Sequence, residues 1–134
     1  MAVQRLHHVG IAVADLEASV ATYTALFGAT VEHRAAVPDQ GVEACSLLLG
    51  AGRVELLQPL GGDTPVGRFL ERRGPGLHHV AFAVADVGAE LARLAAAGVE
   101  LIDREPRTGL FGLQVAFVHP QATGGVLAEF VGDD

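Results

Sequence analysis

The chain lacks several features that mark common protein classes. Its 134 residues include a single cysteine, Cys45, and no tryptophan. A lone cysteine excludes a disulfide within the chain, which suits a reducing compartment, and we interpret Cys45 as a small buried apolar side chain. No apolar run approaches the roughly 20 residues needed to cross a bilayer, and no signal peptide is visible. We therefore expect a cytoplasmic protein with no membrane partner.

Positive charge is also scarce. The chain has nine basic and sixteen acidic residues, so its formal net charge is −7 at pH 7. Such a surface repels a phosphate backbone, and we expect no nucleic-acid partner. Half of the residues are apolar, and a chain of this length can bury the core of one ordinary domain. The composition thus predicts a single globular domain over residues 1–134.

An internal repeat is the most informative feature of the sequence. The stretch LHHVGIAVADLE at residues 6–17 recurs as LHHVAFAVADVG at residues 77–88. Both copies alternate as half-buried strands do, with bulky apolar side chains on one face. The opposite face carries a histidine followed by small residues, which leaves room for a ligand. The repeat predicts two copies of one structural unit.

Each repeated strand is followed by the signals of a helix. Asp15 and Asp86 stand where N-caps are expected, and Gly28 and Gly98 stand where the helices should end. Strand-like runs then follow in both halves, at residues 29–37, 42–49, 53–58, 99–104, 112–118 and 125–131. Both halves therefore read as one strand, one helix and three strands.

These elements predict an α+β fold of two pseudo-symmetric βαβββ modules. The first module spans residues 5–60 and the second 77–134, and residues 61–76 form a linker with a short helix that Thr64 caps. A single four-stranded sheet with one helix leaves a face uncovered. We therefore expect the modules to form a cupped, partly closed mixed sheet with the helices outside. Apolar strand edges suggest a homodimer.

Four polar residues occupy matching places in the two modules. His8 and His79 match in the first strands, and Glu55 and Glu129 match in the last. A pseudo-twofold axis would bring these four side chains together, and two imidazoles with two carboxylates suit a divalent cation of borderline hardness. A structural zinc site is a weaker interpretation because such sites usually use cysteine. The alternative for each residue alone is structural, as a hydrogen-bonded histidine or a solvated glutamate.

Two further histidines carry a different expectation. By the alternation of the strands, His7 and His78 point away from the face that carries His8 and His79. We interpret both as structural residues.

The combination of paired modules and ligand order resembles a known family. Segments such as LHHVGIAVADLEAS at residues 6–19, GPGLHHVA at 74–81 and FVHPQATGGVLAEF at 117–130 are similar to the methylmalonyl-CoA epimerase family of the vicinal oxygen chelate (glyoxalase/bleomycin resistance) superfamily. The resemblance implies metal ligands at His8, Glu55, His79 and Glu129. It implies a cofactor of one divalent ion, Co2+ first, with Mn2+, Zn2+, Ni2+ and Mg2+ as alternatives. It also implies an acyl-CoA substrate, interconverted between the (2R) and (2S) forms of methylmalonyl-CoA.

Such an epimerisation removes the proton between a thioester and a carboxylate, which gives an enolate that a cation can stabilise. Inversion needs a proton donor on each face, and Glu55 and Glu129 come from opposite modules, so we regard both as candidate catalytic residues. Glu43 is a competing base. A family glutamate would fall on Ala44, and one step along a strand reverses the face.

Other functions stay open on the sequence. A glyoxalase I-type isomerase (lactoylglutathione lyase) would use the same metal set. A ring-cleaving dioxygenase usually needs two histidines and one carboxylate, so Glu55 argues against it. A non-enzymatic binding module of the same fold would need no set of metal ligands.

Candidates for contacts with the phosphates of coenzyme A are Arg72, Arg73, Arg104 and Arg107.

Overall fold

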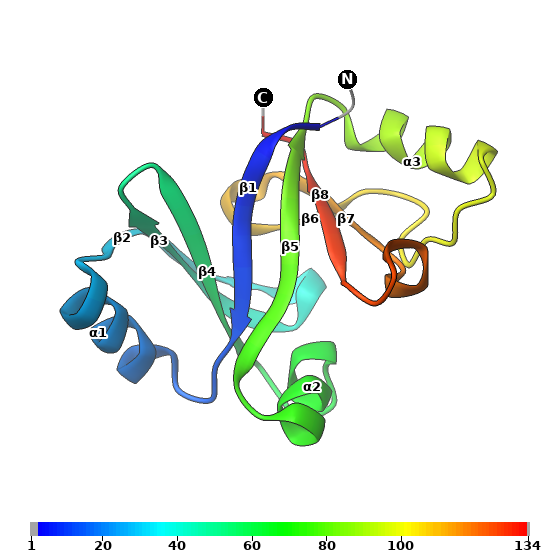
Figure 1. The fold of residues 1–134 in the computed structure, drawn as a ribbon. Helices are drawn as coiled ribbons and strands as arrows, with labels where there is room; N and C mark the ends of the chain where they lie inside the picture. The colour runs from blue at the N-terminus through cyan, green and yellow to red at the C-terminus, as the bar shows by residue number, and fades with distance from the viewer. Residues whose placement is uncertain (1–2, 134) are drawn as a thin grey trace. The chain divides into compact units, whose positions relative to one another are not determined.

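The computed structural model describes residues 3–133, drawn in Figure 1. The strands are β1 (Val3–Ala12), β2 (Thr30–Val37), β3 (Val42–Leu49), β4 (Gly52–Pro59), β5 (Gly76–Val84), β6 (Arg107–Thr108), β7 (Gln114–Val118) and β8 (Ala128–Val131). The α-helices are α1 (Leu16–Phe27), α2 (Pro65–Arg73) and α3 (Val87–Ala96), and short 3-10 turns lie at Pro38–Gln40, Leu110–Gly112 and Pro120–Thr123. The order strand, helix, strands thus occurs on both sides of α2, as the repeat predicts.

The strands pair in the order β2-β3-β4-β1 in the first module and β5-β8-β7-β6 in the second. In both modules the first strand lies parallel to the last, because β1 pairs with β4 and β5 pairs with β8. The remaining pairs within each module are antiparallel. A mixed sheet with equivalent pairing in two modules is the α+β arrangement that the sequence predicts.

The chain divides into two compact units. One unit is His8–His78, and the other joins the described residues up to His7 with those from His79 onward. The division therefore cuts the repeated strands β1 and β5 immediately beside the repeated histidines. Whether residues 1–134 act as one domain stays a prediction.

The helix ends confirm the capping signals. The Asp15 carboxylate accepts a hydrogen bond from the Ala18 backbone N–H at 3.1 Å, and Gly28 ends α1 at φ 67°, where a glycine carries no steric penalty. Asp86 caps α3 in the same way at 3.0 Å. In the linker, the Thr64 hydroxyl accepts from the Gly67 N–H at 3.1 Å, and Pro65 opens α2.

The apolar face of each repeated strand packs against its own helix. In the first module Ile11 and Val13 contact a buried cluster that includes Leu16 of α1 and Leu47 of β3. In the second module Phe82 and Val84 pack with Val87 and Leu91 of α3. These apolar residues fill one face of each strand. His8 and His79 alternate with them, so both histidines lie on the opposite face, together with the small residues.

The second module differs from the sequence prediction at residues 99–104, which do not form a strand. Leu101 makes an isolated bridge to Val118, and the ladder with β7 is instead made by the two-residue strand β6. The Asp103 carboxylate accepts from the Phe117 N–H at 2.8 Å, so a side chain replaces the backbone acceptor of a regular ladder. Pro106 also lacks the N–H that a continued strand would need.

The last two strands, β7 and β8, are also shorter than predicted. A 3-10 turn at Leu110–Gly112 precedes β7, which begins at Gln114. A second turn at Pro120–Thr123 precedes β8, which begins at Ala128.

Among the described residues, no helix is both long enough and apolar enough to span a bilayer.

Candidate functional site

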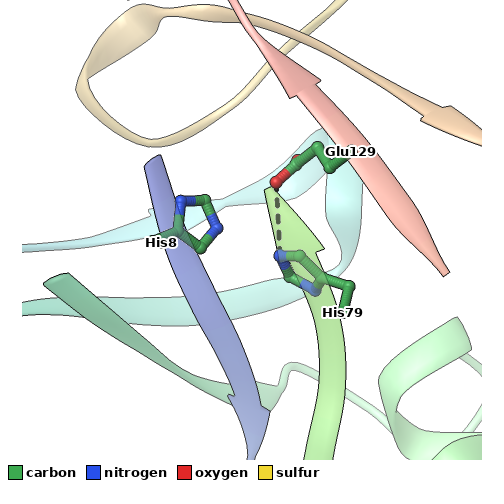
Figure 2. Close-up of side chains that lie close together, drawn as sticks. All are labelled: His8, His79 and Glu129. Atoms are coloured by element: carbon green, nitrogen blue, oxygen red, sulfur yellow. Dashed lines mark ion pairs between the residues drawn. The ribbon is translucent and has the colours of Figure 1, made fainter. Parts of the chain in front are cut away.

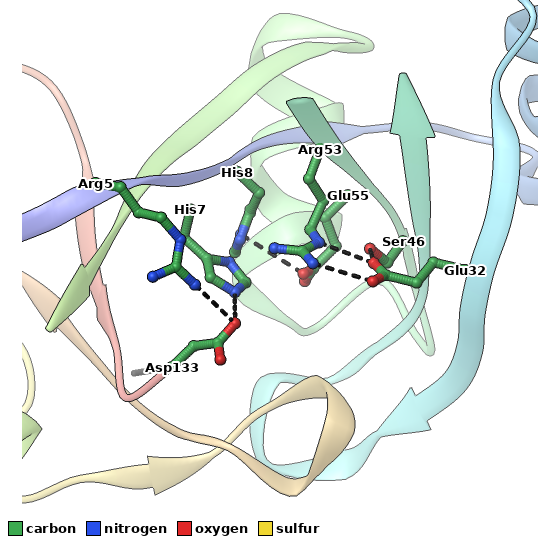
Figure 3. A network of polar contacts seen from close by, with 8 residues as sticks. All are labelled: Arg5, His7, His8, Glu32, Ser46, Arg53, Glu55 and Asp133. Atoms are coloured by element: carbon green, nitrogen blue, oxygen red, sulfur yellow. Dashed lines mark hydrogen bonds and ion pairs between the residues drawn. The ribbon is translucent and has the colours of Figure 1, made fainter. Parts of the chain in front are cut away.

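The first histidine–carboxylate pair joins the first and last strands of the first module. Gly10 of β1 lies opposite Glu55 of β4 in the parallel register, so His8, two residues before Gly10, shares its face with Glu55. His8 Nε2 lies 3.6 Å from Glu55 Oε2, as Figure 3 shows. The exposed fractions are 3% for His8 and 6% for Glu55, so this pair is buried in a sheet face.

The second module repeats the pair. Ala81 of β5 lies opposite Glu129 of β8, and His79 stands two residues before Ala81. His79 Nε2 lies 3.2 Å from Glu129 Oε1, the contact drawn dashed in Figure 2. The exposed fractions are 3% and 2%. The four residues predicted from the repeat are thus two equivalent pairs, each made by a first and a last strand.

The geometry of each pair fits a shared cation. Two donor atoms bound to one ion at about 2.0–2.2 Å, at angles of 90–110°, lie roughly 2.8–3.6 Å apart. The measured separations of 3.6 Å and 3.2 Å fall within that range. His8, His79 and Glu129 each offer a buried imidazole nitrogen or carboxylate oxygen. Burial of a carboxylate is costly without a cationic partner, so the donor set fits a divalent metal.

The structure adds a polar cluster that sequence reasoning missed. Ser46 of β3 lies directly opposite Glu55 in the antiparallel β3–β4 pair and is fully buried. Its hydroxyl donates to Glu32 Oε1 at 2.7 Å. Arg53 donates two hydrogen bonds to the same carboxylate, from Nε at 2.8 Å and from Nη2 at 3.0 Å, as Figure 3 shows. Glu32 lies at a register shift in β2, and no sequence pattern predicts such a shift. The spacing of Arg53 and Glu55, two residues apart on one strand, did indicate that both side chains share a face.

The surroundings of the second pair are apolar. Phe117 of β7 takes the place opposite Glu129 that Ser46 takes opposite Glu55. Its ring meets the His79 ring edge-on, with the centroids 5.4 Å apart. Ala81, Val115 and Val131 form a buried cluster around this region. The two equivalent carboxylates therefore lie in different environments, one polar and one apolar.

Glu43 lies on the opposite face of β3 from Ser46. Its neighbours at alternate positions, Cys45 and Leu47, belong to the core beneath α1. Its carboxylate accepts a hydrogen bond from Arg34 Nε at 3.0 Å, and Arg34 Nη1 donates to Glu17 of α1 at 2.8 Å. The hydrogen bond to Glu43, and then the one to Glu17, raises the pKa of Arg34 further above its usual value. Glu43 is thus part of a charged cluster on the helix side of the sheet.

Ala44, by contrast, faces the same side as Ser46 and Glu55. It stands two residues before Ser46 and is fully buried. The face that carries the His8–Glu55 pair therefore has a methyl group at the position onto which the family glutamate falls.

The histidines that precede His8 and His79 in the two repeats have structural contacts. His7 Nε2 lies 2.8 Å from Asp133 Oδ2, and Arg5 contacts the same oxygen at 3.2 Å. The His78 ring meets the Phe69 ring of α2 edge-on, with centroids 5.0 Å apart. Both placements agree with the structural interpretation of His7 and His78.

Comparison with known proteins places the fold and the site in context. Residues 7–117 match the Glyoxalase/Bleomycin resistance protein/Dioxygenase superfamily. The chain is 41% identical over 127 residues to an ethylmalonyl-CoA/methylmalonyl-CoA epimerase of Cereibacter sphaeroides, covering 93% of this chain and 95% of the relative. It is 38% identical over 126 residues to the human mitochondrial methylmalonyl-CoA epimerase, covering 93% of this chain and 72% of that protein.

The same relationship holds among solved structures. A methylmalonyl-CoA epimerase in complex with methylmalonyl-CoA and NH4+ aligns with a TM-score of 0.92 and 39% identity, covering 96% of this chain and 94% of that chain. A likeness of this extent confirms the α+β fold that the repeat predicts.

Proposed function

Because the chain belongs to the Glyoxalase/Bleomycin resistance protein/Dioxygenase superfamily, we propose that it is an isomerase that interconverts (2R)- and (2S)-methylmalonyl-CoA. The observation that carries this proposal is the likeness, over 96% of the chain, to an epimerase bound to methylmalonyl-CoA. The two buried histidine–glutamate pairs supply the donor atoms that such a reaction needs. The substrate is a small-molecule acyl-CoA thioester.

We propose that His8, Glu55, His79 and Glu129 hold one divalent ion. Support comes from the equivalent positions of the pairs in the two modules and from the donor separations within each pair. Two glutamates neutralise the charge of the ion, and two imidazoles favour a metal of borderline hardness. Co2+ is the first candidate, with Mn2+, Zn2+, Ni2+ and Mg2+ as alternatives. When bound, the cation supplies stabilisation of the negative charge that develops on the thioester oxygen.

The protein's own groups then have to move the proton. The hydrogen to be removed lies between a thioester and a carboxylate, and a carboxylate within hydrogen-bond reach is a competent base. We assign proton transfer on the two faces of that carbon to Glu55 and Glu129, because they come from opposite modules. Both side chains are buried, so less bulk water screens the negative charge that develops on the substrate.

Glu43 remains the competing base. Its position on the helix side of β3, in contact with Arg34, weighs against direct contact with a substrate that lies beside Glu55. A role for Glu43 would require the substrate or the strand to present the other face.

The decisive experiment is incubation of the purified protein with Co2+ and methylmalonyl-CoA in deuterated water, followed by proton NMR. We expect metal-dependent loss of the α-proton signal together with racemisation. Turnover of a glutathione hemithioacetal without this exchange would transfer the assignment to a glyoxalase I-type isomerase. Absence of both activities, together with no affinity for divalent ions, would favour a binding module.

We further propose a cytoplasmic homodimer. Leu26 and Phe27 at the end of α1 and Val31 on the edge strand β2 are exposed apolar side chains that a second copy could cover. Cys45 is a free buried thiol, which suits a reducing compartment. Light scattering coupled to gel filtration tests the oligomer: a mass near that of one chain, 13.9 kDa, would refute the dimer.

A further inference from the structure

The arginines of this acidic protein differ in whether a carboxylate neutralises them. All nine basic residues are arginines. Most of them form ion pairs with carboxylates, namely Arg5, Arg34, Arg53, Arg68, Arg93 and Arg107. Within the described residues 3–133, Arg72, Arg73 and Arg104 form no such ion pair. All three are candidates for phosphate contacts on the sequence, whereas the fourth candidate, Arg107, is paired with Asp103 at 3.1 Å.

Two of these three arginines are consecutive in the chain, and the side chain of one of them contacts an aromatic ring. Arg72 and Arg73 are the last two residues of α2 and are exposed. The guanidinium carbon of Arg73 lies 5.6 Å from the centre of the Phe69 ring, within the range of a cation–π contact. Phe69 in turn packs edge-on against His78, at 5.0 Å between centroids. Arg73 is therefore connected through the Phe69 ring to His78 of β5, the strand that also carries His79.

Arg104 offers a poorer anion site. It is a single cation in the segment between α3 and β6, and acidic residues precede and follow it, Asp103 and Glu105. The end of α2 carries two consecutive arginines, and the only acidic side chain of that helix is Glu71.

On the premise of the proposed function, we propose that Arg72 and Arg73 bind the phosphate groups of the coenzyme A portion of the substrate. A planar guanidinium matches phosphate oxygens in pairs, which makes arginine the preferred residue for this recognition. A chain of net charge −7 repels a polyanion in general, so binding needs a local cationic site. The phosphates lie at the far end of the pantetheine arm from the thioester, so their site belongs outside the histidine–glutamate pairs.

The test compares substrates with and without phosphates. The double variant Arg72→Gln/Arg73→Gln is assayed with methylmalonyl-CoA and with methylmalonyl-pantetheine, which lacks every phosphate. Arg93→Gln, which removes an exposed arginine paired with Glu90, is the matched control. Each contact between an exposed arginine and a phosphate is weak by itself. Because the double variant loses two such contacts together, we expect it to raise KM for the CoA ester by about tenfold. We expect kcat, both constants for the pantetheine ester, and the Arg93→Gln kinetics to stay at wild-type values.

A structural role for the two arginines would give a different result. An equal rise of KM for both esters, or a fall of kcat with both, would overturn the proposal, and so would an unchanged KM for the CoA ester. The dephospho-CoA ester locates the contact. A KM effect that persists with it assigns the diphosphate, and an effect that disappears assigns the 3′-phosphate.

Direct binding separates this proposal from the proposed function. Calorimetric titration of the metal-loaded protein with free coenzyme A needs no turnover. Weaker binding by the double variant, with wild-type binding by Arg93→Gln, supports the arginine site even if the protein epimerises nothing. Equal binding by the wild type and the double variant, or no binding by the wild type, overturns it.

Discussion

Arg34 of β2 and Glu43 of β3 are joined by a hydrogen bond across the antiparallel strand pair, with Arg34 Nε 3.0 Å from Glu43 Oε2. Glu17 of α1 contacts the same guanidinium. The contact ties the carboxylate of Glu43 to the helix side of the sheet, away from the face of Ser46 and Glu55. Because of this placement, substitution of Glu43 tests directly whether a carboxylate on the helix side of the sheet transfers protons.

Glu43→Gln should leave kcat within about twofold of the wild type, because an amide keeps the side-chain volume and the residue is remote from the reacting face. The measurement is the rate of α-proton exchange of methylmalonyl-CoA in deuterated water. A loss of tenfold or more, with unchanged metal affinity, would return Glu43 to the mechanism.

Glu55→Gln and Glu129→Gln should each lower kcat by at least about a hundredfold, because each removes a proposed proton carrier. Each should also weaken Co2+ binding in calorimetry, because the amide oxygen carries no charge. His7→Asn and His78→Asn serve as controls from the same strands and should retain Co2+ affinity. A glutamine variant at 55 or 129 with full activity would remove that residue from the proposed site.

Removal of the metal should abolish exchange and lower thermal stability. A ligand that binds only the folded state stabilises it by mass action, by about 2.7 kcal/mol at a concentration one hundred times Kd. We expect the Tm of chelator-treated protein to rise on titration with Co2+, and the Glu55→Gln/Glu129→Gln double variant to show a much smaller rise. Full exchange activity after exhaustive chelation would contradict the metal proposal.

Glu32→Ala should destabilise the first module without removing a proposed ligand. The substitution takes away both hydrogen bonds from Arg53 and the acceptor of the buried Ser46 hydroxyl. Loss of partners for partly buried polar groups costs about 1–3 kcal/mol. Urea denaturation followed by circular dichroism measures the effect. Glu71→Ala, at an exposed position of α2, is the control and should change the free energy of unfolding by less than about 0.5 kcal/mol.

Cys45 should make stability fall at alkaline pH. Burial raises the pKa of the Cys45 thiol above its ordinary value. The unfolded thiol titrates near ~8.5, so above that pH the unfolded state loses its proton first and gains stability relative to the folded state. The contribution is fully present below pH ~8.5 and is lost as the pH rises toward the folded pKa. Cys45→Ala should flatten this alkaline decline, and the native thiol should react slowly with a disulfide reagent at pH 7.

The repeat, the capping residues and the matching positions of the two histidines and two glutamates were all readable from the sequence. A strand that alternates histidine and small residues with bulky apolar ones has only one way to bury its apolar face. Its periodicity therefore predicts that His8 and His79 lie on the opposite face. Asp15, Thr64 and Asp86 capped their helices as predicted, since capping depends on contacts only three residues away.

Tertiary structure alone decided the features that depend on distant partners. The register shift in β2 brought Glu32 to Ser46 and Arg53, residues 14 and 21 positions away. Asp103 took the Phe117 N–H and so prevented a regular strand at residues 99–104, although the local pattern favoured one. Local sequence fixes periodicity and caps because their interactions span a few residues. Cross-strand neighbours are set by register, and register depends on how a whole sheet packs.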